Sequence, residues 1–182
     1  MPENTDIELV ELFRDAERKH YAFNLLVRKY QEKIYYFVRR MVVDHDDADD
    51  VVQNIFIKVW NNLDCFREDS KLFTWLYRIA VNESLSFLKS KQLRSYLSLS
   101  SPEAQMVKAL HDDPYFDGQE IQKRLREAII RLPKKQQLVF NMRYYDDLSY
   151  DEMSEILGTS VGALKASYHF ATKKIEGFVT SN

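Results

Sequence analysis

The chain has 182 residues, enough for one domain or two small ones. With 45% hydrophobic and 30% charged residues and only four Gly and four Pro, it has the composition of a packed helical protein, which excludes a disordered or fibrous chain. The formal net charge of −2 also excludes a polycation that holds nucleic acid by charge alone.

Cysteine and histidine, the usual zinc ligands, are few in this chain. Cys65 is the single cysteine, so an internal disulfide and a cysteine-based zinc site are excluded, and the four histidines lack metal-ligand spacing. We therefore expect no metal and no cofactor. The first residues have neither a basic start nor an apolar run, and no later stretch could span a bilayer, so we expect a cytoplasmic protein without membrane insertion.

Helical periodicity dominates the first half of the chain. It begins at residue 6 and continues to Met41, which predicts one long helix ending near Asp44. Residues 44–47 are of the capping type and begin a second helix, which buries Ala48, Val51, Val52, Ile55, Phe56 and Val59. A polar loop over 61–70 precedes a third helix, expected at about 71–91.

The composition changes after this helix. Residues 95–118 are rich in turn-forming and acidic residues and predict a flexible linker. Helical periodicity resumes at Ile121, and Pro133 fits the first turn of another helix that runs to Tyr145. The pattern therefore predicts an all-α fold with two small helical domains, residues 1–94 and 119–182, joined by the linker 95–118.

The last third of the chain has the pattern of a helix-turn-helix. Ser149 lies three residues before Glu152, the spacing of a capping box, and predicts a helix start. Gly158 tolerates the positive φ at which that helix must end, and Ser160 can cap the next helix. Such a pair lays its second helix in a DNA major groove. A plain helical hairpin inside a bundle is the alternative.

The second helix of this pair should be amphipathic. Its inward stripe is Val161, Leu164, Tyr168, Ala171 and Ile175. The residues left pointing outward are Gly162, Ala163, Lys165, Ala166, His169 and Lys173. Three of these are basic and four apart, so they share one face that could reach phosphates or guanine edges, while the small ones allow close approach. A solvated basic face is the competing interpretation.

Four blocks of sequence, taken in order, resemble the extracytoplasmic-function (ECF) group of bacterial RNA polymerase sigma factors. They are Phe23-Asn-Leu-Leu-Val-Arg-Lys-Tyr, Asp47-Ala-Asp-Asp-Val-Val-Gln-Asn-Ile-Phe-Ile-Lys-Val-Trp, Phe66-Arg-Glu-Asp-Ser-Lys-Leu-Phe-Thr-Trp-Leu-Tyr-Arg-Ile-Ala-Val-Asn and Leu132-Pro-Lys-Lys-Gln-Gln, the last followed by the hairpin. The resemblance covers nearly the whole chain. It implies a promoter-specificity factor that keeps only regions two and four of the family.

The resemblance also implies roles for residues of the first half. Core RNA polymerase would dock on a polar face formed by Asp50, Gln53 and Asn54, where many relatives carry Glu at the last position. The −10 promoter element would be melted and read by Phe66, Ser70, Lys71, Trp75, Tyr77, Arg78 and Asn82. Phe73 shares a helical side with buried positions and is expected in the core, whereas Trp75 could belong to either environment.

The second half would read the −35 promoter element. The residues implied are Ser160, Gly162, Ala163, Lys165, Ala166, His169 and Lys173. Ser167 and Phe170 stand where many relatives carry Arg, so a base preference cannot be transferred. Asp112, Asp113 and Asp117 resemble the acidic segment that threads toward the polymerase active centre, where negative charge suits a basic channel.

The partners implied are core RNA polymerase, promoter DNA and an anti-sigma factor, and the free chain is expected to be a monomer that catalyses nothing itself. A free-standing helix-turn-helix regulator is the main alternative; it would dimerise on a palindromic site. An enzyme is a third class. The chain has no glycine-rich phosphate loop, metal cluster or nucleophile–base spacing that would support it.

Overall fold

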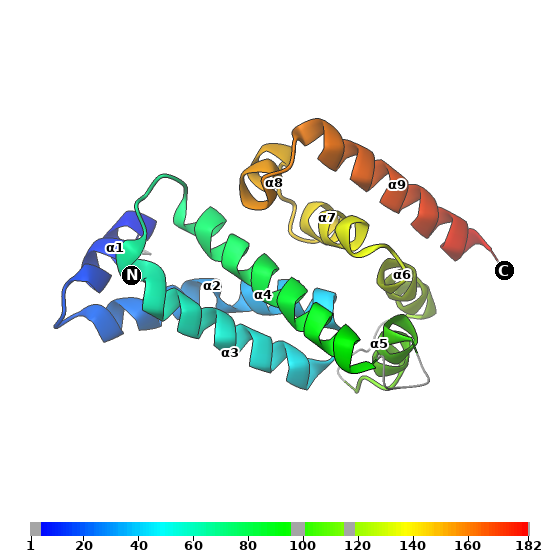
Figure 1. Ribbon diagram of the computed structural model, residues 1–182, viewed down its shortest axis with the longest axis horizontal. Helices are drawn as coiled ribbons and strands as arrows, with labels where there is room; N and C mark the ends of the chain where they lie inside the picture. The colour runs from blue at the N-terminus through cyan, green and yellow to red at the C-terminus, as the bar shows by residue number, and fades with distance from the viewer. Residues whose placement is uncertain (1–4, 96–100, 115–118, 182) are drawn as a thin grey trace.

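The computed structural model describes residues 5–95, 101–114 and 119–181, and over these ranges it confirms the all-α prediction (Figure 1). The α-helices are α1 (Asp6–Arg14), α2 (Lys19–Val42), α3 (His45–Asn62), α4 (Leu72–Ser95), α5 (Pro102–His111), α6 (Glu120–Ile130), α7 (Lys134–Tyr144), α8 (Tyr150–Leu157) and α9 (Val161–Thr180), and a 3-10 turn, η1 (Leu63–Cys65), follows α3. None of the described helices is long and apolar enough to cross a membrane.

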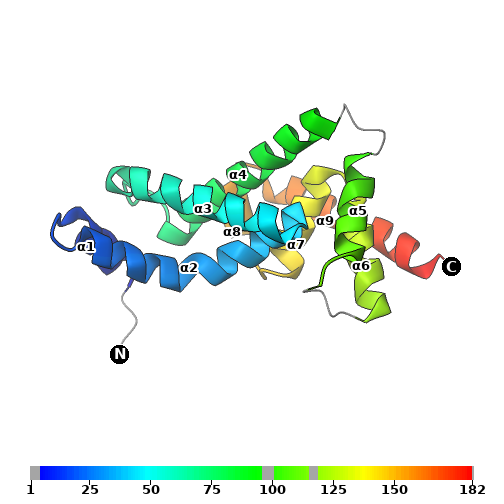
Figure 2. The same cartoon turned by 90° about the horizontal axis from the view of Figure 1, so that it is seen from below.

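The two halves of the chain lie against each other. Helices α1 to α4 form one end of the molecule, α6 to α9 form the other, and α5 packs beside α6 near the end of α4 (Figures 1 and 2). Direct contacts join α2 to α7 and α4 to α8. The structure thus fixes a relative placement of the halves that the sequence pattern left open.

The single long helix predicted over the first 44 residues is wrong, because the chain turns between α1 and α2. The Asp15 carboxylate accepts hydrogen bonds from the Glu17 backbone N–H at 3.0 Å and from Arg18 Nε at 2.7 Å. Asp side chains that bond to nearby backbone N–H groups compete with helix continuation in this way. Hydrophobic periodicity continues across the break because both helices bury their apolar stripes in one core.

Helix α5 lies inside the segment predicted to be a flexible linker, so that prediction is wrong for residues 102–111. The Ser101 hydroxyl caps the helix by accepting a hydrogen bond from the Ala104 N–H at 3.2 Å. Pro102 lies in the first turn, where the backbone N–H that proline lacks would have no partner within the helix. Met106 and Leu110 lie four residues apart and are both buried. A Ser-Pro start and one buried apolar pair are thus enough to specify a helix among turn-type residues.

The helix-turn-helix prediction is confirmed in detail. Ser149 and Glu152 form the capping box that starts α8, with the Ser149 N–H donating to the Glu152 carboxylate at 2.9 Å. These bonds hold the pKa of Glu152 below its usual value. Gly158 ends α8 with a φ of 61°, and Ser160 caps α9. The turn is therefore specified by local chemistry.

One hydrophobic core crosses the boundary between the halves. Met41 and Ile34 of α2 belong to the same buried cluster as Leu138 and Met142 of α7 and Met153 of α8. A smaller second cluster joins α6, α7 and α9. The two predicted domains therefore share apolar contacts rather than standing apart.

A buried carboxylate lies at this boundary. Asp146, just after α7, forms an ion pair with Arg40 of α2 and accepts a hydrogen bond from the Tyr77 hydroxyl of α4. The side chains of Arg40 and Asp146 are only 9% and 15% exposed. Burial raises the pKa of Asp146 and, together with the Asp146 charge, raises the pKa of Tyr77 well above its ordinary value. Three helices thus depend on one carboxylate.

Replacing Asp146 by Asn should lower the free energy of unfolding by about 2–3 kcal/mol, because the change removes the charge that compensates the buried guanidinium of Arg40. Asp147→Asn is the matched control, since that side chain is 93% exposed and should change stability by less than about 0.5 kcal/mol. Urea denaturation followed by circular dichroism measures both. Equal stabilities of the two variants would contradict the role given to Asp146.

Candidate nucleic-acid interface

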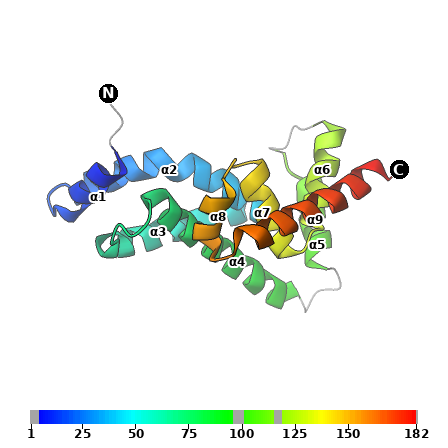
Figure 3. The same ribbon diagram turned by 90° about the horizontal axis from the view of Figure 1, so that it is seen from above.

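All seven residues predicted to read the −35 element are exposed on or beside α9. The set is Ser160, Gly162, Ala163, Lys165, Ala166, His169 and Lys173. Their common orientation follows from the opposite stripe, where Leu164, Ala171 and Ile175 are buried. Figure 3 shows α9 extending from α8 toward the C-terminus. The helix therefore presents one continuous uncovered face of small and basic residues.

Two aromatic rings lie beside the basic residues of this face. The Lys165 ammonium lies 5.7 Å from the ring centroid of Tyr150, within cation–π range, which ties the lysine to the start of α8. Phe170 is 55% exposed, and its ring centroid lies 5.9 Å from that of His169. The sequence pattern indicated Phe170 only as a position where many relatives carry Arg. The structure adds an exposed aromatic ring next to His169.

The candidate −10 residues divide by burial. Lys71, Arg78 and Asn82 are exposed, and Ser70 and Trp75 are half-buried. Phe66 and Tyr77 are only 6% and 1% exposed. The seven residues therefore do not form one open surface in this conformation.

Phe66 and Tyr77 have structural surroundings. The Phe66 ring lies 5.4 Å from that of Trp75, and its carbonyl accepts a hydrogen bond from Arg14 Nη2 at 2.8 Å. Tyr77 lies 4.8 Å from Phe37, ring to ring, and bonds to Asp146. Neither ring is available to stack on a base in this arrangement. Sequence spacing alone could not distinguish buried from exposed aromatic residues in α4 and the loop before it.

Helix α8 covers part of the −10 face of α4. Arg78 Nη2 donates a hydrogen bond to the backbone carbonyl of Glu155 at 2.8 Å, and the hydroxyl of the preceding residue, Tyr77, donates one to the Asp146 carboxylate. Both acceptors belong to the C-terminal half. The structure therefore brings the helix-turn-helix against the surface predicted to melt the promoter, a contact that no sequence motif indicated.

The predicted docking face on α3 is open. Asp50, Gln53 and Asn54 are all exposed. Beside them lies an apolar groove of about 440 Å³ between α2 and α3, lined by Phe23, Val27, Gln31, Val52, Gln53, Phe56, Ile57 and Trp60. Ile57 is 57% exposed, the clearest signal of the groove. The sequence pattern predicted only the polar edge of this surface, because helical spacing alone does not show that Ile57 and Trp60 line a groove.

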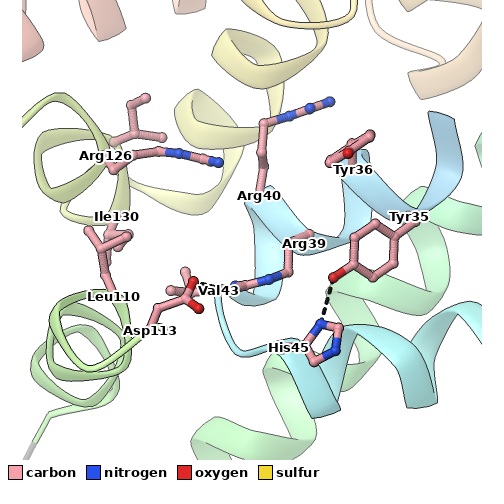
Figure 4. Close-up of a pocket in the computed structure, with 11 residues that line it drawn as sticks. Tyr35, Tyr36, Arg39, Arg40, Val43, His45, Leu110, Asp113, Arg126 and Ile130 are labelled. Carbon is pink, nitrogen blue, oxygen red and sulfur yellow. Dashed lines mark hydrogen bonds and ion pairs between the residues drawn. The ribbon is translucent and has the colours of Figure 1, made fainter. Parts of the chain in front are cut away.

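Of the three acidic residues singled out in the predicted linker, Asp112 and Asp113 lie in different environments. Asp113 forms an ion pair with Arg39 of α2 and is 8% exposed as a side chain. It lies at a cavity of about 270 Å³ between α2, α5 and α6, where Arg126 also points inward (Figure 4). Asp112 is exposed at the end of α5, and Asp117 lies outside the described residues. Asp113 therefore does not extend into solvent here.

Comparison with known proteins places both halves. The family model of sigma-70 region 2 matches residues 26–94, and that of sigma-70 region 4 matches residues 122–175. The ECF RNA polymerase sigma-E factor of Escherichia coli strain K12 is 36% identical over 183 residues, covering 96% of this chain and 94% of that protein. The RNA polymerase sigma-H factor of Pseudomonas aeruginosa is 29% identical over 97% of this chain and 94% of that protein.

Two solved structures have the same fold. CnrH in complex with the cytosolic domain of CnrY matches with a TM-score of 0.71 and 20% identity, covering 98% of this chain and 99% of that one. The sigma factor RpoE of Bartonella quintana, in complex with the anti-sigma factor NepR, matches with a TM-score of 0.67 and 20% identity over 88% of this chain and 98% of that one.

The burial of Phe66 leads to a test that separates packing from DNA contact. Phe66→Ala should destabilise the fold by about 3 kcal/mol, because it leaves a cavity beside Trp75. Lys71→Ala, in the same segment but exposed, should change stability by less than about 0.5 kcal/mol. Thermal and urea unfolding report both values. A Phe66→Ala protein as stable as the Lys71→Ala protein would show that the ring is not a core element.

Proposed function

The chain belongs to the ECF group of bacterial RNA polymerase sigma factors, and we propose that its two halves have different functions. The chain is a promoter-specificity factor that binds core RNA polymerase and directs transcription initiation. In the proposal, residues 1–94 dock on the polymerase and open the −10 element, and residues 119–182 hold the −35 element. A free-standing regulator is not favoured, because such a protein has no use for a region 2 domain.

The observation that carries this assignment is the exposed face of α9. Seven residues predicted from the sequence lie exposed on or beside one helix, whose opposite side is buried at Leu164, Ala171 and Ile175. Lys165 and His169 are the leading candidates for contacts to base edges in the major groove, and Lys173 for a phosphate. Gly162 and Ala163 allow the helix backbone to approach the bases closely. Such a face is the requirement for a recognition helix.

Docking on the polymerase is proposed for the α3 surface. Exposed Asp50, Gln53 and Asn54 form its polar part, and the groove containing Ile57 and Trp60 forms its apolar part. A protein interface typically combines an apolar centre with a polar rim, which this surface supplies. The polymerase element that fits it would carry apolar side chains flanked by basic ones.

Promoter opening is proposed to need no covalent catalysis. Base–aromatic stacking contributes about 1–3 kcal/mol per base, whereas a DNA stacking step is worth about 1.4 kcal/mol. A few side chains that each bind one unstacked base can therefore offset the free-energy cost of melting a few base pairs. Lys71, Arg78 and Asn82, with the partly exposed Ser70 and Trp75, are the residues proposed to contact the −10 strand. Phe66 and Tyr77 support these residues from the core.

The contact between α8 and α4 implies a conformational change. Arg78 cannot read DNA while it is bonded to the Glu155 carbonyl, and α8 lies over the same face. We therefore infer that the described arrangement is a closed one and that the halves separate when polymerase and promoter bind. A partner that binds only the separated form shifts the population toward it by its differential affinity.

An anti-sigma factor is the proposed negative regulator. Both structural neighbours were solved with a second protein, CnrY for CnrH and the anti-sigma factor NepR for RpoE. A partner of this kind would act by covering the α3 groove or by holding the halves together. The site of action is proposed to be the cytoplasm, where RNA polymerase works.

Lys165→Ala should weaken binding of a −35 element by about 1–3 kcal/mol, because the lysine supplies a base or phosphate contact from the exposed face. Lys174→Ala is the matched control, because Lys174 is exposed on the same helix but points to the opposite side of the helix axis from Lys165. Footprinting of the reconstituted holoenzyme measures both. Loss of upstream protection in both variants alike would point to general charge, and loss in neither would remove α9 as the reader.

The double change Asp50→Ala with Gln53→Ala should weaken binding to core polymerase at least about tenfold while leaving the fold intact, because both side chains are exposed. Glu11→Ala with Glu17→Ala removes exposed residues of the same half outside the proposed surface. Pull-down titration with core enzyme compares the two proteins. Unchanged affinity of the first variant would contradict the docking assignment.

A further inference from the structure

A small apolar pocket lies where α4, α5 and α7 meet, away from both proposed DNA surfaces. Its volume is about 220 Å³, and its walls are mainly aliphatic side chains and stems: Leu85, Leu88, Lys89, Lys91, Gln92, Pro102, Glu103, Gln105, Met106 and Lys134. Pockets of this kind, apolar with a few polar groups, are typical of sites for small molecules. None of the roles proposed above uses it.

The lysine at this pocket is poorly compensated. The Lys134 ammonium contacts the Gln137 carboxamide oxygen at 3.2 Å and the Met106 sulfur at 3.7 Å. Among the described residues, no carboxylate lies within ion-pair distance of it, and Glu103 acts on it only from further away. Burial lowers the pKa of Lys134, and the more distant charge of Glu103 offsets this only in part.

The hydrogen bonding of Gln137, which contacts Lys134, is also incomplete. This residue is fully buried, and its carboxamide nitrogen has no hydrogen-bond partner in the described part of the chain. Buried polar groups without partners are uncommon in native proteins and call for an explanation. Gln137 lies behind Lys134 and outside the pocket wall, so the side chain that holds the ammonium is itself incompletely hydrogen-bonded.

The charges around the pocket favour an anion. Lys89 is exposed at its rim, and Lys91 is paired with Asp47. Glu103 is the single carboxylate among the lining residues, against three lysines. An acidic headgroup would thus meet net positive charge, and an aliphatic chain would cover Leu85, Leu88 and Met106.

We propose that this pocket binds a small amphipathic carboxylate, with its headgroup on Lys134 and its aliphatic chain between α4 and α5. The pocket volume suits a chain of medium length rather than a membrane lipid. Binding would bury apolar surface and give the ammonium the ion-pair partner that it lacks. Because α4 and α7 belong to different halves, an occupied pocket would also stabilise the closed arrangement in proportion to ligand concentration.

The test uses sodium octanoate at concentrations below micelle formation, with the intact chain. Isothermal titration should show saturable binding, and the melting temperature should rise with octanoate. Octylammonium, which has the same chain and the opposite charge, should show neither effect. Lys134→Met should weaken octanoate binding at least tenfold, whereas Lys135→Met, an exposed neighbour, should leave it unchanged.

The results separate a built site from adventitious binding. If octanoate and octylammonium bind equally, or if Lys134→Met binds as tightly as the native chain, the carboxylate site is disproved. Absence of any octanoate binding disproves it too. Should Lys134→Met fold poorly, ¹³C-labelled lysine in the unmutated protein decides the question, because octanoate must raise the pKa of Lys134 selectively. These readouts do not involve polymerase or DNA, so they are independent of the proposed function.

Discussion

The arrangement of this protein depends on one buried carboxylate. Asp146 follows α7, yet its two partners, Arg40 and Tyr77, belong to helices of the other half. Burial raises the pKa of Asp146, so Arg40 and Tyr77 are needed to keep the carboxylate ionised at this desolvated position. If the halves part, water must replace both partners. The same interaction therefore stabilises the closed form and makes that form reversible.

The contact between the halves leaves the two proposed DNA surfaces differently exposed. The face of α9 is open, whereas the proposed −10 face of α4 is partly covered by α8 through Arg78 and the Glu155 carbonyl. In the proposed account, the closed form exposes the surface for the −35 element and covers part of the surface for the −10 element. Polymerase docked on the exposed α3 groove would separate the halves only through further contacts that the closed form blocks, because the groove itself is equally open in both forms.

Local rules predicted the parts of the fold that local chemistry specifies. The capping box at Ser149, the left-handed Gly158 and the exposed face containing Lys165 all follow from spacing alone, and the structure has each of them. Tertiary contacts were beyond such rules. The burial of Phe66 and Tyr77 depends on which helix packs over α4, and the partners of Asp146 are separated from it by up to 106 residues. The helix α5 was hidden by turn-type residues, and the break at Asp15 by continuous periodicity.

Separation of the halves is tested most directly by a distance measurement. Cys65 is exposed and is the single cysteine, so a spin label there pairs with a second label at Glu155→Cys on α8, the residue whose backbone carbonyl contacts Arg78 of α4. Double electron–electron resonance on the free chain should give one narrow, short distance distribution. Addition of core polymerase and promoter DNA should replace it by a longer one. Retention of the short distance in the promoter complex would contradict the account.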